Sequence, residues 1–470
     1  MQKQERSQML GTMPMTRLVP TISIPVMVSM LVQALYNVVD SIFVSRYDPN
    51  GLTAVSLAYP IQMLMVALAV GMGIGISSLI SRKLGEQSPE QARRAAWNGL
   101  AIEVMGFALF CLVGLFLAGT LMRMTVSDNL SGADEILTMG TDYLRIVTTC
   151  SLGMFMAIFF ERLLQSTGNT VLSMITQMAG AVTNMILDPI MIFGYFGCPA
   201  MGVRGAAIAT VIGQFVSFLI GLVFNQVKNQ ELRLSLSQLR IDPILLRGIF
   251  SVGLPSTVMQ AIASVMNIGL NSLLSGFAEG NAAVNVLNVY FKLQSFVFMP
   301  VFGLGTGVIA IVGYNYGARN QKRVYSAIRV CLAWALAIMI LGTLLFMLFP
   351  SQLMSLFEAG DGGEVTNAMT RLGVVALRTI SLSFVLAAIG IVLSNVYQAV
   401  GKGMYSLIMS LCRQLLVLLP VAWLLAHTIG TVDAVWWAFP ISEAISCIIC
   451  LLLFRRLDRQ MLRPLASAEK

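Results

Sequence analysis

Charged residues are scarce in this sequence, and their scarcity decides the class of protein. Of the 470 residues, only 11% are Asp, Glu, Lys or Arg, whereas 57% are apolar. Soluble globular proteins are about 25% charged. At roughly 150 residues per domain, a soluble chain of this length would need about three domains and far more charge to cover them. The composition excludes that class and predicts a polytopic membrane protein.

Other absences argue against enzymes and nucleic-acid binders. The single histidine, His427, cannot supply a metal cluster, and of the seven cysteines only Cys447 and Cys450 form a CxxC, inside an apolar run with no second pair nearby. Small apolar packing explains these cysteines better than metal or redox chemistry. There is no Walker A sequence and no Ser/His/Asp set. The net charge is +8, but the basic residues form no dense face. We therefore expect no enzymatic activity, no cofactor and no nucleic-acid partner.

Long apolar runs dominate what is present. A membrane helix needs about 20 mostly apolar residues. The sequence predicts twelve spans, at 18–44, 53–80, 95–119, 139–163, 171–194, 204–226, 248–276, 284–314, 326–349, 372–398, 405–427 and 435–454. The first run is too long for the apolar region of a cleavable signal peptide and contains an acid, so we expect no such peptide.

The basic residues predict the orientation. Twelve spans place both termini on one side of the membrane. The segments on that side hold twenty-one Lys and Arg residues, and the opposite segments hold four, which are Arg46, Arg123, Arg204 and Arg371. Because basic loops stay in the cytoplasm, we expect a multi-pass protein of the plasma or inner membrane with both termini cytoplasmic.

The chain contains one pattern twice. The segment "SIPVMVSMLVQALYNVVDSIFVSRY" aligns with "VGLPSTVMQAIASVMNIGLNSLLSGF", and "GMGIGISSLISRKLGEQ" aligns with "GLGTGVIAIVGYNYGAR". A third pair, "RLLQSTGNTVLSMI" and "SNVYQAVGKGMYSLIM", keeps nearly the same offset of 230 to 233 residues. These matches predict an all-α membrane fold of two homologous six-helix bundles inserted the same way up. Parallel repeats of this kind are frequent in transporters, with the substrate site where the repeats meet.

The repeat also predicts the domain boundaries. We expect a cytoplasmic tail at 1–17, an N-lobe of six spans at 18–226, a basic cytoplasmic linker at 227–247, a C-lobe of six spans at 248–454 and a second cytoplasmic tail at 455–470.

Two acids inside the spans stand out as candidate functional residues. An ionisable side chain at the bilayer centre costs at least about 2.5–3.5 kcal/mol. Asp40 shares a helical face with Gln33 and Asn37, and Asp188 shares one with Gln177 and Asn184. With Thr210 of the sixth span, Asp40, Asn184 and Asp188 would offer the all-oxygen ligands that hard cations prefer.

The chemistry of this predicted site stays open at this point. Two acids in one dry pocket repel each other, so the pocket could take a proton instead of Na⁺. Alternatively, each acid only hydrogen-bonds a neighbouring helix. The second half lacks these acids. It has neutral polar residues in place of the stripe that holds Asp40, and Val421 or a near neighbour in place of Asp188. We expect a cavity lined by Gln33, Tyr36, Asn37, Gln177, Gln214, Gln260, Asn267 and Lys292.

Other ionisable residues give weaker signals. We expect Arg413 and Glu443 to form a structural ion pair between the eleventh and twelfth spans. Glu103 is expected to hydrogen-bond a helix neighbour. Glu161 and Arg162 lie near a helix end, where long side chains can reach the membrane surface.

These residues carry a family resemblance. "IPVMVSMLVQALYNVVDSIFVSR", "LQSTGNT", "NMILDPIMIFG" and "MGVRGAAIATVIGQ" resemble the multidrug and toxic compound extrusion (MATE) transporters, and the resemblance covers about residues 15–455. It implies an antiporter that exports organic, often cationic compounds while Na⁺ or H⁺ enters. In the prokaryotic branch with an N-lobe cation site, the ligands correspond to Asp40, Asn184, Asp188 and Thr210, and Asn37 lines the same pocket. The norfloxacin-exporter branch adds acids on the seventh and tenth spans, which this sequence lacks.

One alternative function shares the same plan. Flippases for lipid-linked oligosaccharide or peptidoglycan precursors belong to the same superfamily, but usually carry more basic charge in the cavity than Lys292 and Arg413 provide. Between these functions we expect the antiporter, which works by alternating access of the two lobes as a monomer. Its expected partners are small organic substrates and membrane lipid.

Overall fold

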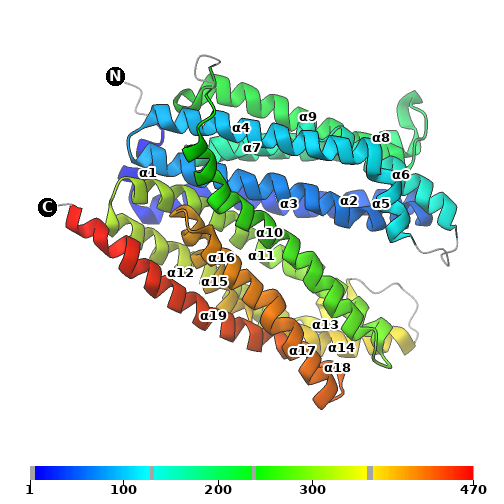
Figure 1. Cartoon of the computed structure of the whole chain (residues 1–470). Coiled ribbons are helices and arrows are strands. Elements are labelled where there is room, and N and C mark those ends of the chain that lie inside the picture. Colours follow the sequence, from blue (N-terminus) through cyan, green and yellow to red (C-terminus); the bar gives the residue numbers. More distant parts are fainter. Residues whose placement is uncertain (1–5, 127–131, 236–239, 357–363, 469–470) are drawn as a thin grey trace.

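The fold consists of helices that form two bundles. The computed structural model describes residues 6–126, 132–235, 240–356 and 364–468, and these contain helices and no strand. The first bundle comprises α2 (Met15–Tyr47), α3 (Pro49–Gly85), α4 (Pro89–Leu112), α5 (Ala118–Thr125), α6 (Ala133–Thr149), α7 (Leu152–Ser166), α8 (Thr170–Phe193) and α9 (Val203–Lys228). The second comprises α10 (Pro243–Leu274), α11 (Gly280–Gly317), α12 (Gln321–Leu348), α13 (Pro350–Ser355), α14 (Glu364–Ser381), α15 (Phe384–Ala399), α16 (Gly403–Leu411), α17 (Leu418–Thr428), α18 (Val432–Val435) and α19 (Ala438–Leu457). In Figure 1 they are the blue-to-green and the green-to-red bundles.

Two of the predicted spans are bent. Ten helices are long and apolar enough to cross a membrane, and two bent pairs raise the number to twelve in the part of the chain that the structure describes. Ala133–Thr149 meets Leu152–Ser166 at 46°, and Met369–Ser381 meets Phe384–Ala399 at 50°. The prediction of two six-helix bundles is confirmed, but the fourth and tenth spans are broken.

Hydroxyl groups that bond to the helix backbone lie at both bends. Thr148 Oγ1 donates to the Leu144 carbonyl at 2.6 Å, and Ser383 Oγ donates to the Ile380 carbonyl at 2.6 Å. A hydroxyl that bonds a carbonyl three or four residues earlier competes with the helical ladder and bends the helix. The bends lie at corresponding places in the two halves, so they belong to the repeat.

The bundles touch each other at the end that carries both termini. Gly75 of α3 lies so close to α10 that an added Cβ would be 2.8 Å from the Gly253 nitrogen. In the same way, a Cβ on Gly303 of α11 would be 2.8 Å from Met27 Cα in α2. Ser78 Oγ donates to the Gln398 carbonyl across this junction at 2.5 Å. Figure 1 shows the bundles converging toward N and C.

At the other end, the same helix faces are exposed. Leu64 lies about two turns from Gly71, on the face of α3 that meets α10, and is 51% exposed. Gln260 of α10 and Lys292 of α11 are also exposed, and each continues a face that touches the first bundle nearer the termini. A cleft therefore opens between the bundles on the side away from the termini.

The short helix α1 (Gln8–Thr12) closes the terminal end. Arg323 Nη2 donates to the carbonyls of Leu10 at 3.0 Å and Met13 at 2.8 Å, which ties the segment to the second bundle. The Ser7 amide donates to Glu231 Oε1 at 2.9 Å, just beyond α9 of the first bundle. The segment at residues 7–13 thus bridges both bundles.

The glycine contact predicts a steric effect. Gly75→Leu should destabilise the protein by about 1–3 kcal/mol, because the new side chain meets backbone that cannot move aside. Thermal unfolding in detergent would measure the loss. Gly119→Leu is the control, because the nearest side-chain atom there, Thr141 Cγ2, lies at an ordinary 3.7 Å. Equal unfolding temperatures for the two variants would contradict the close approach.

Candidate functional site

The candidate site begins with the close packing of α8 against α9. An added Cβ on Gly180 would lie 2.7 Å from the Gly213 carbonyl oxygen. Small residues let helix backbones approach this closely inside a membrane. The contact brings Asn184 and Asp188, one turn apart on α8, opposite Thr210 on α9.

These three side chains are buried and linked to one another. Asn184 Nδ2 lies 3.2 Å from Asp188 Oδ1 and 3.3 Å from Thr210 Oγ1, and donates to both. Asp188 is 0% exposed. Asp188 Oδ2 and Asn184 Oδ1 are also buried, and neither has a hydrogen-bond partner within the described residues. Unpaired buried acceptors are costly, so these oxygens suit a proton or a cation.

Asp40 brings a second carboxyl group to the same place. It lies on α2, which packs against α8. Its Oδ1 is buried without a partner in the described part of the chain, and its charge acts on Asp188. Like charges in a water-poor pocket repel each other and favour uptake of positive charge. The structure thus joins Asn184, Asp188 and Thr210 directly and places Asp40 within electrostatic range of Asp188, so all four residues proposed from the sequence lie in one region.

Two tyrosines complete the surroundings of the acids. The phenols of Tyr36 on α2 and Tyr143 on α6 both lie within the electrostatic field of Asp40 and Asp188. Tyr143 is buried, and its hydroxyl donates to Gln62 Oε1 of α3 at 3.3 Å. The sequence did not point to Tyr143 or Gln62. The only signal was a phenol and an amide inside apolar runs, with nothing in their spacing to connect them to the acids.

The predicted cavity residues of the first bundle lie around this pocket. Gln177 Nε2 donates to Gln33 Oε1 at 2.8 Å, and this bond joins α8 to α2 at an exposed edge. Gln214 is one turn beyond Thr210 on α9, and its buried Oε1 has no partner among the described residues. Asn37 belongs to α2, but its side chain is outside the described residues, so its role stays a prediction.

The second bundle carries neutral polar residues and one lysine on the two helix faces that touch the first bundle nearer the termini. Gln260 and Asn267 follow the face of α10 that begins at Gly253, where α10 touches α3. Lys292 lies about three turns before Gly303, on the face of α11 that touches α2. All three therefore point toward the cleft between the bundles.

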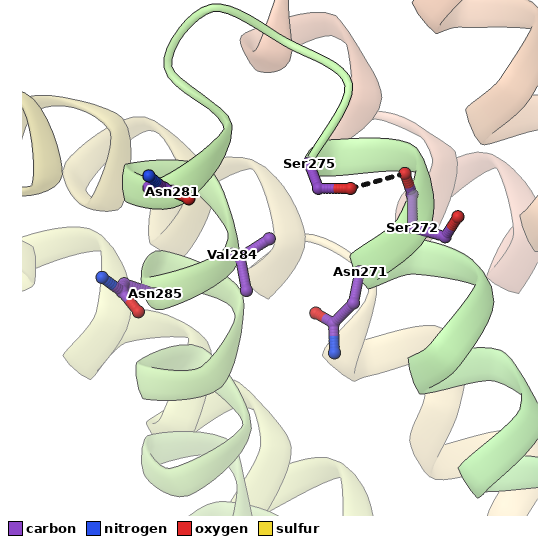
Figure 2. A pocket seen from close by; sticks show the side chains of 6 residues that line it. All are labelled: Asn271, Ser272, Ser275, Asn281, Val284 and Asn285. Carbon is purple, nitrogen blue, oxygen red and sulfur yellow. Dashed lines mark hydrogen bonds between the residues drawn. The ribbon is translucent and has the colours of Figure 1, made fainter. Parts of the chain in front are cut away.

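A polar pocket continues this face of α10 away from the termini. Figure 2 shows Asn271, one turn beyond Asn267, with Asn281 and Asn285 on the first turns of α11. The pocket has a volume of about 490 Å³ and is completed by Ser272, Ser275 and Val284. Its lining is uncharged, and it lies apart from the acids.

The weaker sequence signals have mixed outcomes. Arg413 Nε lies 2.9 Å from Glu443 Oε1, so the predicted ion pair is confirmed. The expectation for Glu103 is wrong, because neither of its buried oxygens has a hydrogen-bond partner in the described residues. The expectation for Arg162 is also wrong, because this side chain turns inward and is 6% exposed.

Comparisons with known proteins agree with this architecture. The model of the MatE family matches residues 25–190 and 255–424, once in each bundle. Multidrug export protein MepA of Staphylococcus saprophyticus is 27% identical over 438 residues, covering 92% of this chain and 91% of that protein. A MOP superfamily transporter from Pyrococcus furiosus superposes with a TM-score of 0.89 at 26% identity over 100% of both chains. A multidrug resistance MATE family transporter in an outward-facing conformation gives a TM-score of 0.89 at 26% identity, over 99% of this chain and 100% of that one.

The Arg413–Glu443 pair predicts a pattern of stabilities. Glu443→Leu should cost about 3 kcal/mol, because it leaves a largely buried guanidinium group without its partner. The double variant Arg413→Met with Glu443→Leu should recover most of that loss, since apolar replacement of a whole buried pair is nearly neutral. Thermal unfolding of the single and double variants tests this. A double variant as unstable as the single one would contradict it.

Proposed function

The chain belongs to the MatE family of membrane transporters, and we propose that it exports organic, drug-like compounds in exchange for Na⁺ or H⁺. The observation that carries the proposal is the buried pocket of Asp40 and Asp188, with acceptor oxygens that lack partners among the described residues. The similarity to MepA, a multidrug export protein, supports drug-like compounds as the substrate class.

In the proposed orientation of the protein in the membrane, both termini lie in the cytoplasm. The excess of Lys and Arg on the side of the termini supports this. Because the bundles meet at that end, the cleft then opens to the outside. The high TM-score with a transporter in an outward-facing conformation, 0.89, is consistent with this arrangement.

In the proposed mechanism, the cation enters from the outside and binds between α2, α8 and α9. Asp40 and Asp188 supply the negative charge, and Asn184 and Thr210 supply neutral oxygens. Asn184 also holds Asp188 in place through its amide nitrogen. One positive charge that moves inward through 100 mV releases about 2.3 kcal/mol, enough to sustain a roughly fifty-fold substrate gradient.

The substrate occupies the cleft between the bundles. Its walls combine the acids of the first bundle with Gln260, Asn267 and Lys292 of the second. Binding of the cation and of the substrate then favours different positions of the two bundles, and the change from one position to the other exports the substrate. An antiporter requires that the cation and the substrate prefer different positions of the bundles, because a ligand shifts an equilibrium only through unequal affinity for the two states.

Transport in proteoliposomes tests the proposal. A Na⁺ gradient and a pH gradient are imposed separately, and at least one of them should drive dye accumulation. If one ion is exchanged per dye molecule, a driving force equivalent to 100 mV should give roughly fifty-fold accumulation. Asp40→Asn and Asp188→Asn should each abolish it, because the amide cannot carry the coupling charge. Asp134→Asn, an exposed acid at the start of α6, is the control.

If both Asp variants retain ion-driven accumulation, the assigned pocket is not the coupling site. If the unmodified protein moves a fluorescent lipid-linked precursor across the bilayer and exports no dye, the flippase is the better function.

Alternating access predicts that α1 must leave its place when the terminal end opens. Arg323→Met removes bonds from a charged donor worth about 1.5–3 kcal/mol each, so opening of this end should become about tenfold more frequent or more. Maleimide labelling of Ser78→Cys, in a background without the native cysteines, measures the opening. Arg323→Lys should give an intermediate rate. Unchanged labelling in Arg323→Met would show that α1 does not control this end.

A further inference from the structure

A second group of buried charges lies in the first bundle, apart from the Asp40 and Asp188 pocket. Glu103 of α4 is 1% exposed and Arg162 of α7 is 6% exposed. Glu161 precedes Arg162 on α7. On α8, Ser173 of this group is fifteen residues from Asp188, which at 1.5 Å per residue is about 22 Å toward the termini. The two groups are therefore separate.

A chain of hydrogen bonds holds one side of this group. Arg162 Nη1 donates to Gln165 Oε1 at 2.9 Å, and Gln165 Nε2 donates to Glu161 Oε1 and to Ser173 Oγ, each at 2.9 Å. The other side lacks such bonds. Both oxygens of Glu103, and Nε of Arg162, are buried without a hydrogen-bond partner in the described residues.

Arg162 is the cation that both acids share. Its charge interacts with that of Glu161 and with that of Glu103. Other ionisable groups on the helices around α4 are engaged or positioned elsewhere. Arg145 of α6 and Arg247 of α10 are exposed. Asp134 and Glu135 of α6 are exposed as well. The others bond elsewhere: Asp142 pairs with Arg204, Lys83 with Glu86 and Arg94 with Glu90, Glu231 accepts from the Ser7 amide, Arg93 donates to the Glu231 carbonyl, and Arg82 Nε donates to the Ser78 carbonyl.

The charge balance of this group points to a ligand. Two carboxylates and one guanidinium group leave one negative charge. Glu161 is half-buried, but Glu103 is buried, and an unbalanced charge there is very costly. A single proton restores neutrality. Na⁺ fits less well, because Glu103 has no neutral oxygen bonded beside it in the described residues, whereas hard cations take several oxygen ligands. We propose that Glu103 and Glu161, the two acids beside the permanently charged Arg162, bind one proton between them and form a proton-binding site separate from the Asp40 and Asp188 pocket.

The position of the site connects it to the junction of the bundles. A Cβ on Gly73 of α3 would lie 3.0 Å from Arg162 Cγ. Gly71 and Gly75, on the opposite face of the same turns, touch Thr257 and Gly253 of α10. Arg162 therefore lies directly behind the part of α3 that closes the terminal end. Loss of the shared proton draws the guanidinium group toward the second carboxylate and changes the support of α3. This role in gating rests on the proposed function, whereas proton binding does not.

Infrared spectroscopy of the purified, full-length protein tests proton binding without any transport. A protonated carboxylic acid has a carbonyl band that a carboxylate lacks. At neutral pH, we expect Glu103→Gln and Glu161→Gln each to lose one such band, because the remaining acid is then balanced by Arg162. Arg162→Leu should gain one, because both acids then bind protons. Glu90→Gln, an exposed acid on α4 paired with Arg94, is the matched control and should change nothing.

The two proposals fail in different ways. If Glu103→Gln and Glu161→Gln both keep the full band, the acids hold no shared proton and the second site is refuted, even if Asp40→Asn abolishes efflux. If either variant fails to fold, the other variant and Arg162→Leu still give opposite band changes to compare. For gating, Glu103→Gln should lose the dependence of dye efflux on the pH of the compartment that faces the termini. Retention of that dependence would overturn the gating role.

Discussion

The cost of charge without water is the constraint on which this structure depends. Inside a membrane, a helix makes all of its backbone hydrogen bonds within itself, but an ionised side chain has no water to hydrate it. The protein meets that constraint in different ways. Arg413 and Glu443 neutralise each other at 2.9 Å. Asp40 and Asp188 have acceptor oxygens with no partner among the described residues, and we propose that a bound cation or proton balances their charge. The first solution leaves the interior of a bundle neutral, and the second provides the charge to which we propose the coupling ion binds.

The architecture could be read from the sequence because its physical signals are local. A run of about 20 apolar residues is a span wherever it occurs, and two halves with one pattern must fold alike. The bends in the fourth and tenth spans could not be read in this way. At each bend a hydroxyl, of Thr148 or of Ser383, bonds to the helix backbone, but Thr183 and Ser256 make the same bond inside unbroken helices, so the residue types alone do not mark a break.

The residues of the candidate site also fall into two groups, those whose proximity a single helix predicts and those that only the packing of several helices brings together. Asn184 and Asp188 are one turn apart on a single helix, so their proximity follows from helical geometry. Thr210 lies on another helix, and it was proposed for its hydroxyl oxygen and through the family resemblance. Tyr143 and Gln62 come from two further helices, and only the packing of the bundle shows that they adjoin the acids. For Glu103 and Arg162 the sequence-based expectation was wrong. Each was assigned to an ordinary surface or neighbour contact, yet both side chains turn into the protein.

The docking of α1 has a consequence for how the molecule is made. The bond between Asn315 Nδ2 and the Leu10 carbonyl joins residues 305 positions apart in the chain. The ribosome synthesises Leu10 long before α11 and α12, so this early segment has no binding place until most of the second bundle has entered the membrane. The newly inserted protein therefore passes through a stage in which α1 cannot yet dock, and the end of the bundles that carries the termini closes only after α11 and α12 are in place.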